Sequence, residues 1–240
     1  MTSATLPVAH AAVPSPPRNR LLGGLFIAEA LLSLAPVVVL GAAIGWPASL
    51  DAPAAQQLAA VGAAPDAVRL GYVLYLLYSM AVAPLLIVLA ARTWGSLAHP
   101  AAATVAAFAA LSALARCIGI LRWLTVMPVL AQAHAGADPA TRAQIELVFE
   151  ATTTWGGGIG EILGVSLFMA VALAVLAAGA WQRRTLPRPL ALLGGVSALA
   201  LLLLALPVVG APELMPVALA VSLLSAWMLA VGIALLWRRA

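Results

Sequence analysis

Long apolar runs separated by short polar segments form the main pattern of this sequence. A helix that crosses the hydrocarbon core of a bilayer needs roughly 20 apolar residues. Six runs come close to this length or exceed it, and the third is long enough to tilt or to protrude. We therefore predict an all-α, polytopic transmembrane helical bundle of about six helices. The predicted spans are residues 21–45, 69–91, 101–131, 159–181, 189–206 and 216–237.

The segments before and after the first run are rich in proline and alanine. Residues 1–20 carry arginine only at their end, which is the reverse of a cleaved signal peptide, and we interpret them as a disordered cytoplasmic tail. Residues 21–240 then form a single transmembrane domain. Residues 47–67 are predicted to be an outer loop with a helical turn around residues 54–61.

A second outer segment, residues 138–155, has the pattern of a helix with one polar face. Asp138 is a suitable N-cap, and Pro139 follows at the first helical position. Arg142 and Glu146 are four residues apart and can pair along the helix. This short extra helix either lies on the outer surface or continues the fourth span outward.

The composition agrees with a lipid environment. Hydrophobic residues make up 64% of the 240 residues and charged residues only 8%. A soluble domain has about 25% charged residues, so this chain needs the lipid bilayer as its solvent. We expect a multi-pass protein of the bacterial plasma (inner) membrane.

The arginines predict an orientation. If the N-terminus is inside, the inner loops and tails hold eight of the twelve basic residues, all of them arginine. This asymmetry satisfies the positive-inside rule, so we expect both termini in the cytoplasm. The predicted inner arginines are Arg18, Arg20, Arg92, Arg183, Arg184, Arg188, Arg238 and Arg239.

Several classes of function lack support in the sequence. The arginines stand singly or in pairs rather than in a basic patch, which argues against nucleic-acid binding. The single Cys117 excludes an intrachain disulfide, and no Cys/His spacing resembles a metal site. The histidines lie outside the predicted spans, and no nucleophile or Walker motif occurs. We therefore expect no cofactor and no metal, and an enzyme is the least favoured function.

Four charged residues fall inside the predicted spans: Glu29, Arg116, Arg122 and Glu161. A charge in the hydrocarbon core costs roughly 2.5–3.5 kcal/mol on insertion scales, so each one needs a partner or a purpose. Their depths pair Arg122 with Glu161 and Arg116 with Glu29. The two arginines are about 120° apart around a helix, which predicts that they cannot both face one partner helix.

Two interpretations of the outer polar residues stay open. Glu150 and Glu161 align on one stripe if the helix is unbroken, but the triple glycine at 156–158 puts this continuity in question. One interpretation is a polar cavity that opens outward and binds an ion, a proton or a head group. The other is a set of structural ion pairs between the third and fourth spans. The cavity would be lined by Glu146, Glu150, Thr154, Glu161 and Arg122.

Small residues and aromatic residues suggest how the helices pack. Gly156, Gly160 and Gly164 form a GxxxGxxxG series that lets another helix approach closely, within the bundle or in a dimer. Tyr72, Tyr75 and Ser79 share one face of the second span. We interpret the tyrosines as part of an aromatic belt at the membrane interface.

Several stretches resemble the DUF4386-type family of uncharacterised bacterial membrane proteins. They are ALARCIGILRWLTVMPVLA, AQIELVFEATTTWGGGIGEILG, the LPRPL turn with ALLGGVSALALLLL, and the last helix with Trp227 and Gly232 before LLWRRA. The resemblance covers about residues 111–239, and its strongest element is the GEILG core at Gly160–Gly164. Relatives often carry histidine after this glutamate, where Ile162 stands here. The resemblance implies a multi-pass helical fold and singles out Arg122 and Glu161, without implying an activity.

Two functions remain in competition. The first is a binding, accessory or sensor-type protein with structural intramembrane ion pairs, which meets another membrane protein or a second copy of itself. The alternative is a small proton- or ion-coupled secondary transporter that uses Glu161 and Glu29. Helix breaks expected at Pro36, Pro84, Pro128 and the triple glycine favour the transporter.

Overall fold

The computed structural model describes residues 16–237, with side chains from residue 19 onward. Within this range the protein is all-helical, as predicted, and contains no β-strand. α1 begins inside the predicted tail; residues 1–15 lie outside the described range. The elements are α1 (Pro16–Leu32), α2 (Ala35–Ile44), η1 (Ala48–Asp51), α3 (Ala54–Ala63), α4 (Pro65–Trp94), α5 (Pro100–Gly136), α6 (Pro139–Gly157), η2 (Gly158–Phe168), α7 (Met169–Arg183), α8 (Arg188–Leu203), η3 (Leu206–Val209) and α9 (Val217–Trp237).

The first predicted span contains a break. The apolar stretch Asn19–Ile44 consists of α1 and α2, which are separated by a turn at Ser33 and Leu34. Pro36 lies in the first turn of α2, where its missing N–H breaks no helical hydrogen bond. α2 ends at Gly45, whose φ of 69° is left-handed and suits glycine. The break expected at Pro36 is therefore present, and the predicted end of the span is correct.

The helices at the second and third predicted spans are longer than the predicted runs. α4 and α5 each extend beyond the predicted bounds at both ends, and both have proline in the first turn. The breaks expected at Pro84 and Pro128 do not occur, because both helices continue through these residues. With 37 residues, α5 is about 55 Å long at 1.5 Å per residue, so it protrudes beyond a hydrocarbon core of about 30 Å.

The fourth span is part of one continuous helix, Pro139–Arg183, formed by α6, η2 and α7. Asp138 caps its start by accepting the backbone N–H groups of two first-turn residues. The segment 138–155 therefore continues the fourth span, which decides between the two predicted alternatives. The triple glycine does not break the helix. Instead, the chain passes into η2, a π-helix with i→i+5 hydrogen bonds and a wider turn than an α-helix.

The predicted fifth span corresponds to α8, which is shorter than the helices that are long enough to cross a membrane. α8 has 16 residues, or about 24 Å of helix, and lies against α7 and α9. The multi-pass helical bundle is thus confirmed, while the count of six spans stays a prediction. Five stretches of the described chain are long and apolar enough to cross a membrane: Asn19–Ile44, Pro65–Trp94, Pro100–Gly136, Pro139–Arg183 and Val217–Trp237.

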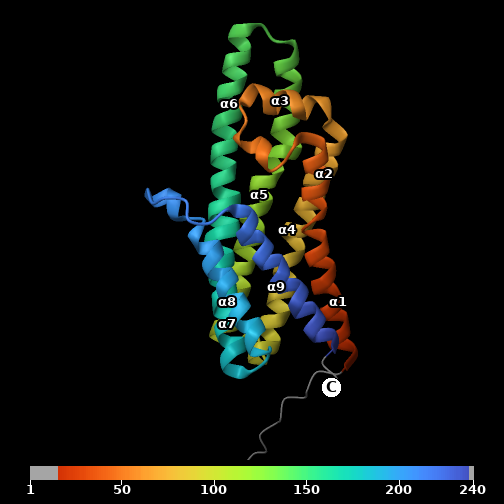
Figure 1. The fold of residues 1–240 in the computed structure, drawn as a ribbon, viewed down its shortest axis with the longest axis vertical. Coiled ribbons are helices and arrows are strands. Elements are labelled where there is room, and N and C mark those ends of the chain that lie inside the picture. Colours follow the sequence, from red (N-terminus) through yellow and green to blue (C-terminus); the bar gives the residue numbers. More distant parts are fainter. Residues whose placement is uncertain (1–15, 238–240) are drawn as a thin grey trace, which may run out of the picture.

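The long helices α4, α5 and α6–η2–α7 follow the long axis of the molecule (Figure 1). We call the end that holds the connections 95–99 and 184–187 the basal end. The opposite end, with the α5–α6 turn at residues 137–138, is the apical end. α1 starts and α9 finishes at the basal end, and α3 lies against α5 and α6 in the apical half.

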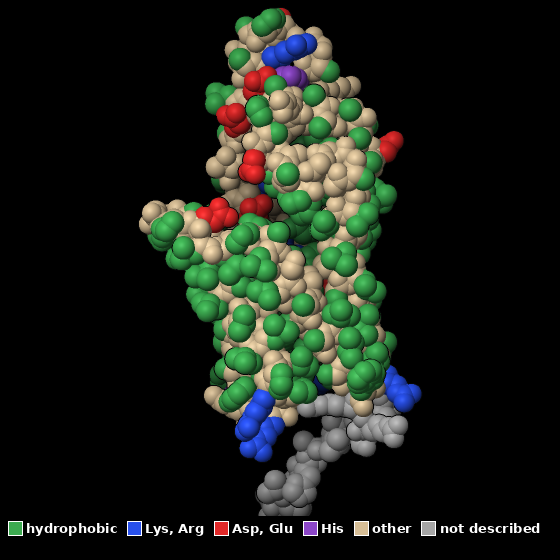
Figure 2. All heavy atoms as spheres, in the orientation of Figure 1, with side chains coloured by type: hydrophobic (Ala, Val, Ile, Leu, Met, Phe, Trp, Pro, Cys, Tyr) green, Lys and Arg blue, Asp and Glu red, His purple; other side chains and the backbone are tan. Residues whose placement is uncertain are grey.

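Two hydrophobic clusters fill the bundle, one in each half. The basal cluster includes the edge-to-face pair Phe26 and Trp227, and the apical cluster includes Tyr72, Trp123 and Phe149. Figure 2 shows hydrophobic side chains over the basal half, arginines at the basal end and a column of acidic side chains along the apical half. The candidate site lies between the two clusters.

Candidate functional site

The candidate site is built on a close contact between α5 and the α6–η2 helix. A Cβ atom added at Gly119 of α5 would lie 2.8 Å from the Cα atom of Gly160 and 2.9 Å from the carbonyl oxygen of Gly156. A Cβ atom at Gly160 would lie 3.2 Å from the Cα atom of Gly119. The two backbones therefore touch where the glycine series of Gly156, Gly160 and Gly164 meets α5, and a methyl group does not fit between them.

Arg116 and Arg122, the two arginines of the third predicted span, lie on either side of this contact. Arg116 and Arg122 are each three residues from Gly119, which places them about 60° to either side of it around α5. A Cβ atom at Gly164 would lie 2.7 Å from Cγ of Arg116, and one at Gly156 would lie 2.7 Å from Cδ of Arg122. Both arginines thus pack on the same helix, which corrects the prediction from their 120° spacing. Their long aliphatic stems make this possible, because they reach the glycines from the two sides.

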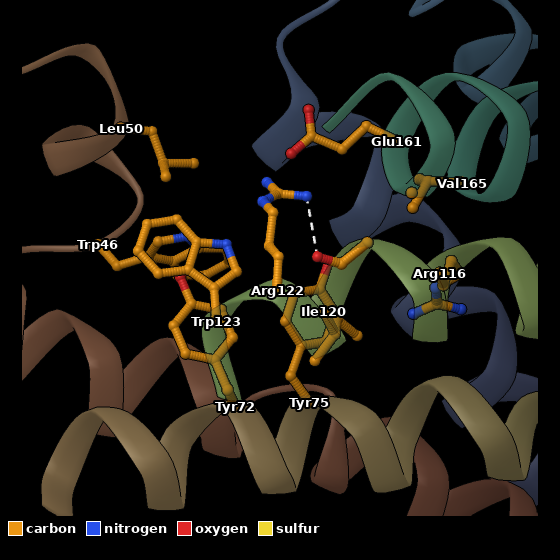
Figure 3. A pocket seen from close by; sticks show the side chains of 12 residues that line it. Trp46, Leu50, Tyr72, Tyr75, Arg116, Ile120, Arg122, Trp123, Glu161 and Val165 are labelled. Carbon is orange, nitrogen blue, oxygen red and sulfur yellow. Dashed lines mark hydrogen bonds between the residues drawn. The ribbon is translucent and has the colours of Figure 1, made fainter. Parts of the chain in front are cut away.

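Arg122 does not form the predicted ion pair. Its Nη1 donates a hydrogen bond to the carbonyl oxygen of Gly119 at 2.8 Å, and its Cζ lies 5.7 Å from the ring centroid of Trp123. Figure 3 shows the carboxylate of Glu161 facing this guanidinium across a gap. Among the side chains of residues 19–237, the only ion pair within 4.0 Å is His134 with Glu146, at 2.8 Å. Arg122 is held by its own helix instead.

Arg116 is buried and also lacks a carboxylate at ion-pair distance. Its side chain is 4% exposed, its Cζ lies 4.5 Å from the ring centroid of Tyr78, and its Nε has no hydrogen-bond partner. Glu29, its predicted partner, is 3% exposed and has no hydrogen-bond partner for Oε1. The two charges still interact electrostatically. The direct pair is absent because the guanidinium lies over the tyrosine ring.

One cavity collects these groups. Arg116, Arg122 and Glu161 line it from α5 and η2, and Tyr75 lines it from α4 (Figure 3). It contains about 400 Å³ of empty space including its open mouth, of which about 40 Å³ admits the centre of a water molecule. One water needs roughly 10–15 Å³ of such space. The enclosed part of the cavity therefore has room for a few waters or for one small polar group, and the rest is open at the mouth.

The outer acidic residues do not line one cavity together. Glu146 pairs with His134, whereas Glu150 and Thr154 line a second, open cavity against residues 50–57. Glu161 alone of the acidic candidates lines the first cavity.

The two tyrosines of α4 do not form an interfacial belt. Tyr72 is 2% exposed, and its ring is stacked on Trp123 with centroids 4.9 Å apart and planes 7° apart. Tyr75 is half-buried and makes an edge-to-face contact with Trp46, 6.0 Å between centroids. These aromatic residues line the same cavity. The shared face of the tyrosines could not distinguish the two locations, because lipid-facing and cavity-facing residues give the same spacing.

The chemistry available in the cavity is that of two cations with spare donors. Guanidinium groups bind carboxylate and phosphate groups in a planar, two-point geometry. Gly119, Trp46 and Trp123 were not singled out by sequence, since nothing local marks them as neighbours of the charged residues. Among the described residues, no three His, Cys, Asp or Glu side chains come together in a group that could hold a metal ion.

Comparison with known proteins gives one match. The family model described as a domain of unknown function (DUF4386) matches residues 21–237, about nine-tenths of the chain. No curated protein and no solved structure matches the chain.

Proposed function

The chain belongs to the DUF4386 family, whose function is unknown, and from this premise we propose that it is a membrane binding protein. Its ligand is a small polar molecule with an acidic group, a carboxylate or a phosphate. The acidic group binds Arg116 and Arg122 in the cavity between α4, α5 and η2.

The observation that carries this proposal is that, among the side chains of residues 19–237, no carboxylate lies within 4.0 Å of either guanidinium. Placing a charge in a membrane costs roughly 2.5–3.5 kcal/mol on insertion scales, so cations without a direct counter-ion need a reason. Arg116 offers an unused Nε at the bottom of the cavity, and Arg122 offers one nearer its mouth. An acidic ligand supplies acceptors for both donors.

The same proposal includes an orientation with the basal end in the cytoplasm of a bacterial cell. Arg20, Arg92, Arg183, Arg184 and Arg188 belong to helix ends and connections at the basal end, which supports this orientation. Arg18, Arg238 and Arg239 lie outside the side chains that the structure describes.

The depth of the cavity follows from the length of α5. Arg116 lies about 24 Å from the basal start of the helix and Arg122 about 33 Å, at 1.5 Å per residue. In a hydrocarbon core of about 30 Å, the first is in the far third and the second at the boundary. The ligand therefore enters from the outer surface or from the outer leaflet.

The test is anion binding by the purified protein in uncharged dodecyl maltoside micelles. Propionate and inorganic phosphate are the probes, measured by calorimetry and by the rise in thermal unfolding midpoint. A hydrogen bond to a charged group contributes about 1.5–3 kcal/mol, so Arg122→Ala should weaken binding tenfold or more. The Arg122→Lys variant keeps a positive charge but loses the planar, two-point geometry of the guanidinium, so its affinity for the probes should be intermediate.

Arg142→Ala is the matched control. Arg142 is exposed near the apical end, and its Nε donates to the carbonyl oxygen of His134 rather than to the cavity. This variant should bind the probes as the unmodified protein does. Equal binding by the Arg122→Ala and Arg142→Ala variants, or no binding of either probe, would refute the proposal.

A second candidate function, a proton-coupled carrier, is favoured by the buried state of Glu29. Its carboxylate is 3% exposed, has an unpartnered oxygen and interacts with Arg116. In proteoliposomes, a pH gradient should then drive propionate uptake, and Glu29→Gln or Glu161→Gln should abolish the coupling. Uptake that is unchanged in both variants would exclude a proton-linked role for these residues.

A further inference from the structure

We propose that the ligand is a small zwitterion, a molecule whose acidic group binds Arg116 and Arg122 while its ammonium group binds Glu161. This inference rests on the proposed function, because it requires that the cavity holds the acidic group of a ligand. It adds a second, cationic half of the ligand and assigns Glu161 as the residue that selects it.

The balance of charge at the cavity is the first argument. Two arginines and two carboxylates belong to this region, since Glu29 interacts electrostatically with Arg116 and Glu161 with Arg122. Their formal charges cancel. A simple anion changes this formal sum by one charge, so it should bind less tightly in a low-dielectric site than a zwitterion does. A zwitterion adds one charge of each sign and leaves the sum at zero.

The order of burial along the cavity is the second argument. Arg116 is 4% exposed, Arg122 is half-buried and Glu161 is exposed. The positive groups therefore lie deep, and the negative group lies at the mouth. A ligand with an acidic end pointing inward and an amine pointing outward matches this order.

The third argument is the unpaired donor of Arg116, the more deeply buried of the two arginines. Nε of Arg116 is buried and has no hydrogen-bond partner in the described part of the chain, and the side chain lines the cavity. At the mouth, the gap between Arg122 and Glu161 keeps the two charges from neutralising each other directly (Figure 3). Trp46 and Tyr75 line the same cavity, and aromatic rings can attract a cation.

Two sources supply this chemistry at the outer boundary of a membrane. One is a free amino acid, and the other is the head group of a zwitterionic phospholipid such as phosphatidylethanolamine. Both present an amine and an acidic group separated by a few bonds. Matched pairs of probes, each pair differing in its ammonium group, separate the two sources.

The experiment uses the full chain in dodecyl maltoside micelles at pH 7. The amino-acid pair is β-alanine and propionate. The head-group pair is glycerophosphoethanolamine and glycerophosphoglycerol, and added phosphatidylethanolamine against phosphatidylglycerol repeats that comparison with intact lipid. Calorimetry gives the affinity of each probe. In at least one pair, the zwitterion should bind about tenfold tighter than its anionic match.

The selecting role of Glu161 is tested in the same pairs. Glu161→Gln should reduce the preference to about one while leaving the anionic probe bound, and Glu161→Asp, which keeps the carboxylate, should restore part of it. Glu150→Gln is the control, because Glu150 lines the other cavity and should leave the preference unchanged.

The outcomes separate this inference from the proposed function. If the anionic probe of each pair binds as tightly as the zwitterion, the inference fails and the proposed function stands. The inference also fails, and the proposed function stands, if the affinity for the anionic probe rises about tenfold for each unit fall in pH. In that case a bound proton, rather than an ammonium group, offsets the charge of the anion. If no probe binds at all, both fail.

Discussion

Replacing Gly119 by alanine tests the contact on which the cavity is built. The new methyl group would lie 2.8 Å from the Cα atom of Gly160 and 2.9 Å from the carbonyl oxygen of Gly156. Both contacts are with backbone atoms, which cannot rotate away as a side chain can. α5 and η2 must therefore move apart locally to accept the methyl group.

The expected loss of stability follows from two opposing terms. Overpacking a tight interface costs about 1–3 kcal/mol. Alanine in place of glycine in a helix contributes about 0.5–1 kcal/mol in the other direction. The net expectation for Gly119→Ala is a loss of about 1–2 kcal/mol in the free energy of unfolding. Binding in the cavity should fall as well, because Arg116 and Arg122 lie on either side of the altered contact.

The assay is equilibrium unfolding in mixed micelles with increasing dodecyl sulfate, followed by the fluorescence of the seven tryptophans. The matched controls are Gly24→Ala in α1 and Gly195→Ala in α8, where a Cβ atom meets nothing within 4 Å. These variants should be as stable as the unmodified protein or slightly more stable. A Gly119→Ala variant as stable as the two controls, with probe binding unchanged, would refute the close backbone contact.

Three further predictions concern single hydrogen bonds and one backbone angle. Ser166→Ala removes the 2.6 Å hydrogen bond from Oγ to the carbonyl oxygen of Leu201 and should cost about 0.5–1.5 kcal/mol of unfolding free energy; Ser166→Thr should recover part of it. Hydrogen bonds from the hydroxyl and backbone N–H of Thr141 hold the pKa of Asp138 below its usual value. Stability from this cap is therefore present above the usual aspartate pKa and is lost as the pH falls through the lowered one. Amide exchange at Thr141 should accelerate there, but an Asp138→Ala variant should show no such pH step. Arg184 ends α7 with a left-handed φ of 56°, so Arg184→Gly should raise stability by about 0.5–1 kcal/mol, whereas Arg184→Ala should not.

The helices and their order follow from local properties of the sequence. A bilayer requires about 20 apolar residues for each crossing and leaves no backbone group unpaired, so hydropathy alone located the helices. The helix start at Asp138 and Pro139 is also local and was predicted correctly. The short α8 and the unbroken course of α4 and α5 were harder, because packing against neighbours decides whether a proline bends or ends a helix.

The candidate residues themselves were also found by sequence. A charge inside an apolar run is conspicuous whatever surrounds it, which singled out Arg116, Arg122, Glu29 and Glu161. The glycine series was visible in the sequence because of its regular spacing of four residues. Gly119 was not, because one glycine in α5 gains its meaning only from Gly160 on another helix.

Tertiary structure alone decided which of these residues meet. Depth along a helix follows from counting residues, but the direction of a side chain depends on the rotation of the helix and on its local geometry. Glu150 and Glu161 line different cavities, and Arg122 donates a hydrogen bond to the carbonyl oxygen of Gly119 rather than to Glu161. Sequence thus determined that charges interrupt the apolar runs, whereas packing determined that both arginines line one cavity with no carboxylate of the described residues at ion-pair distance.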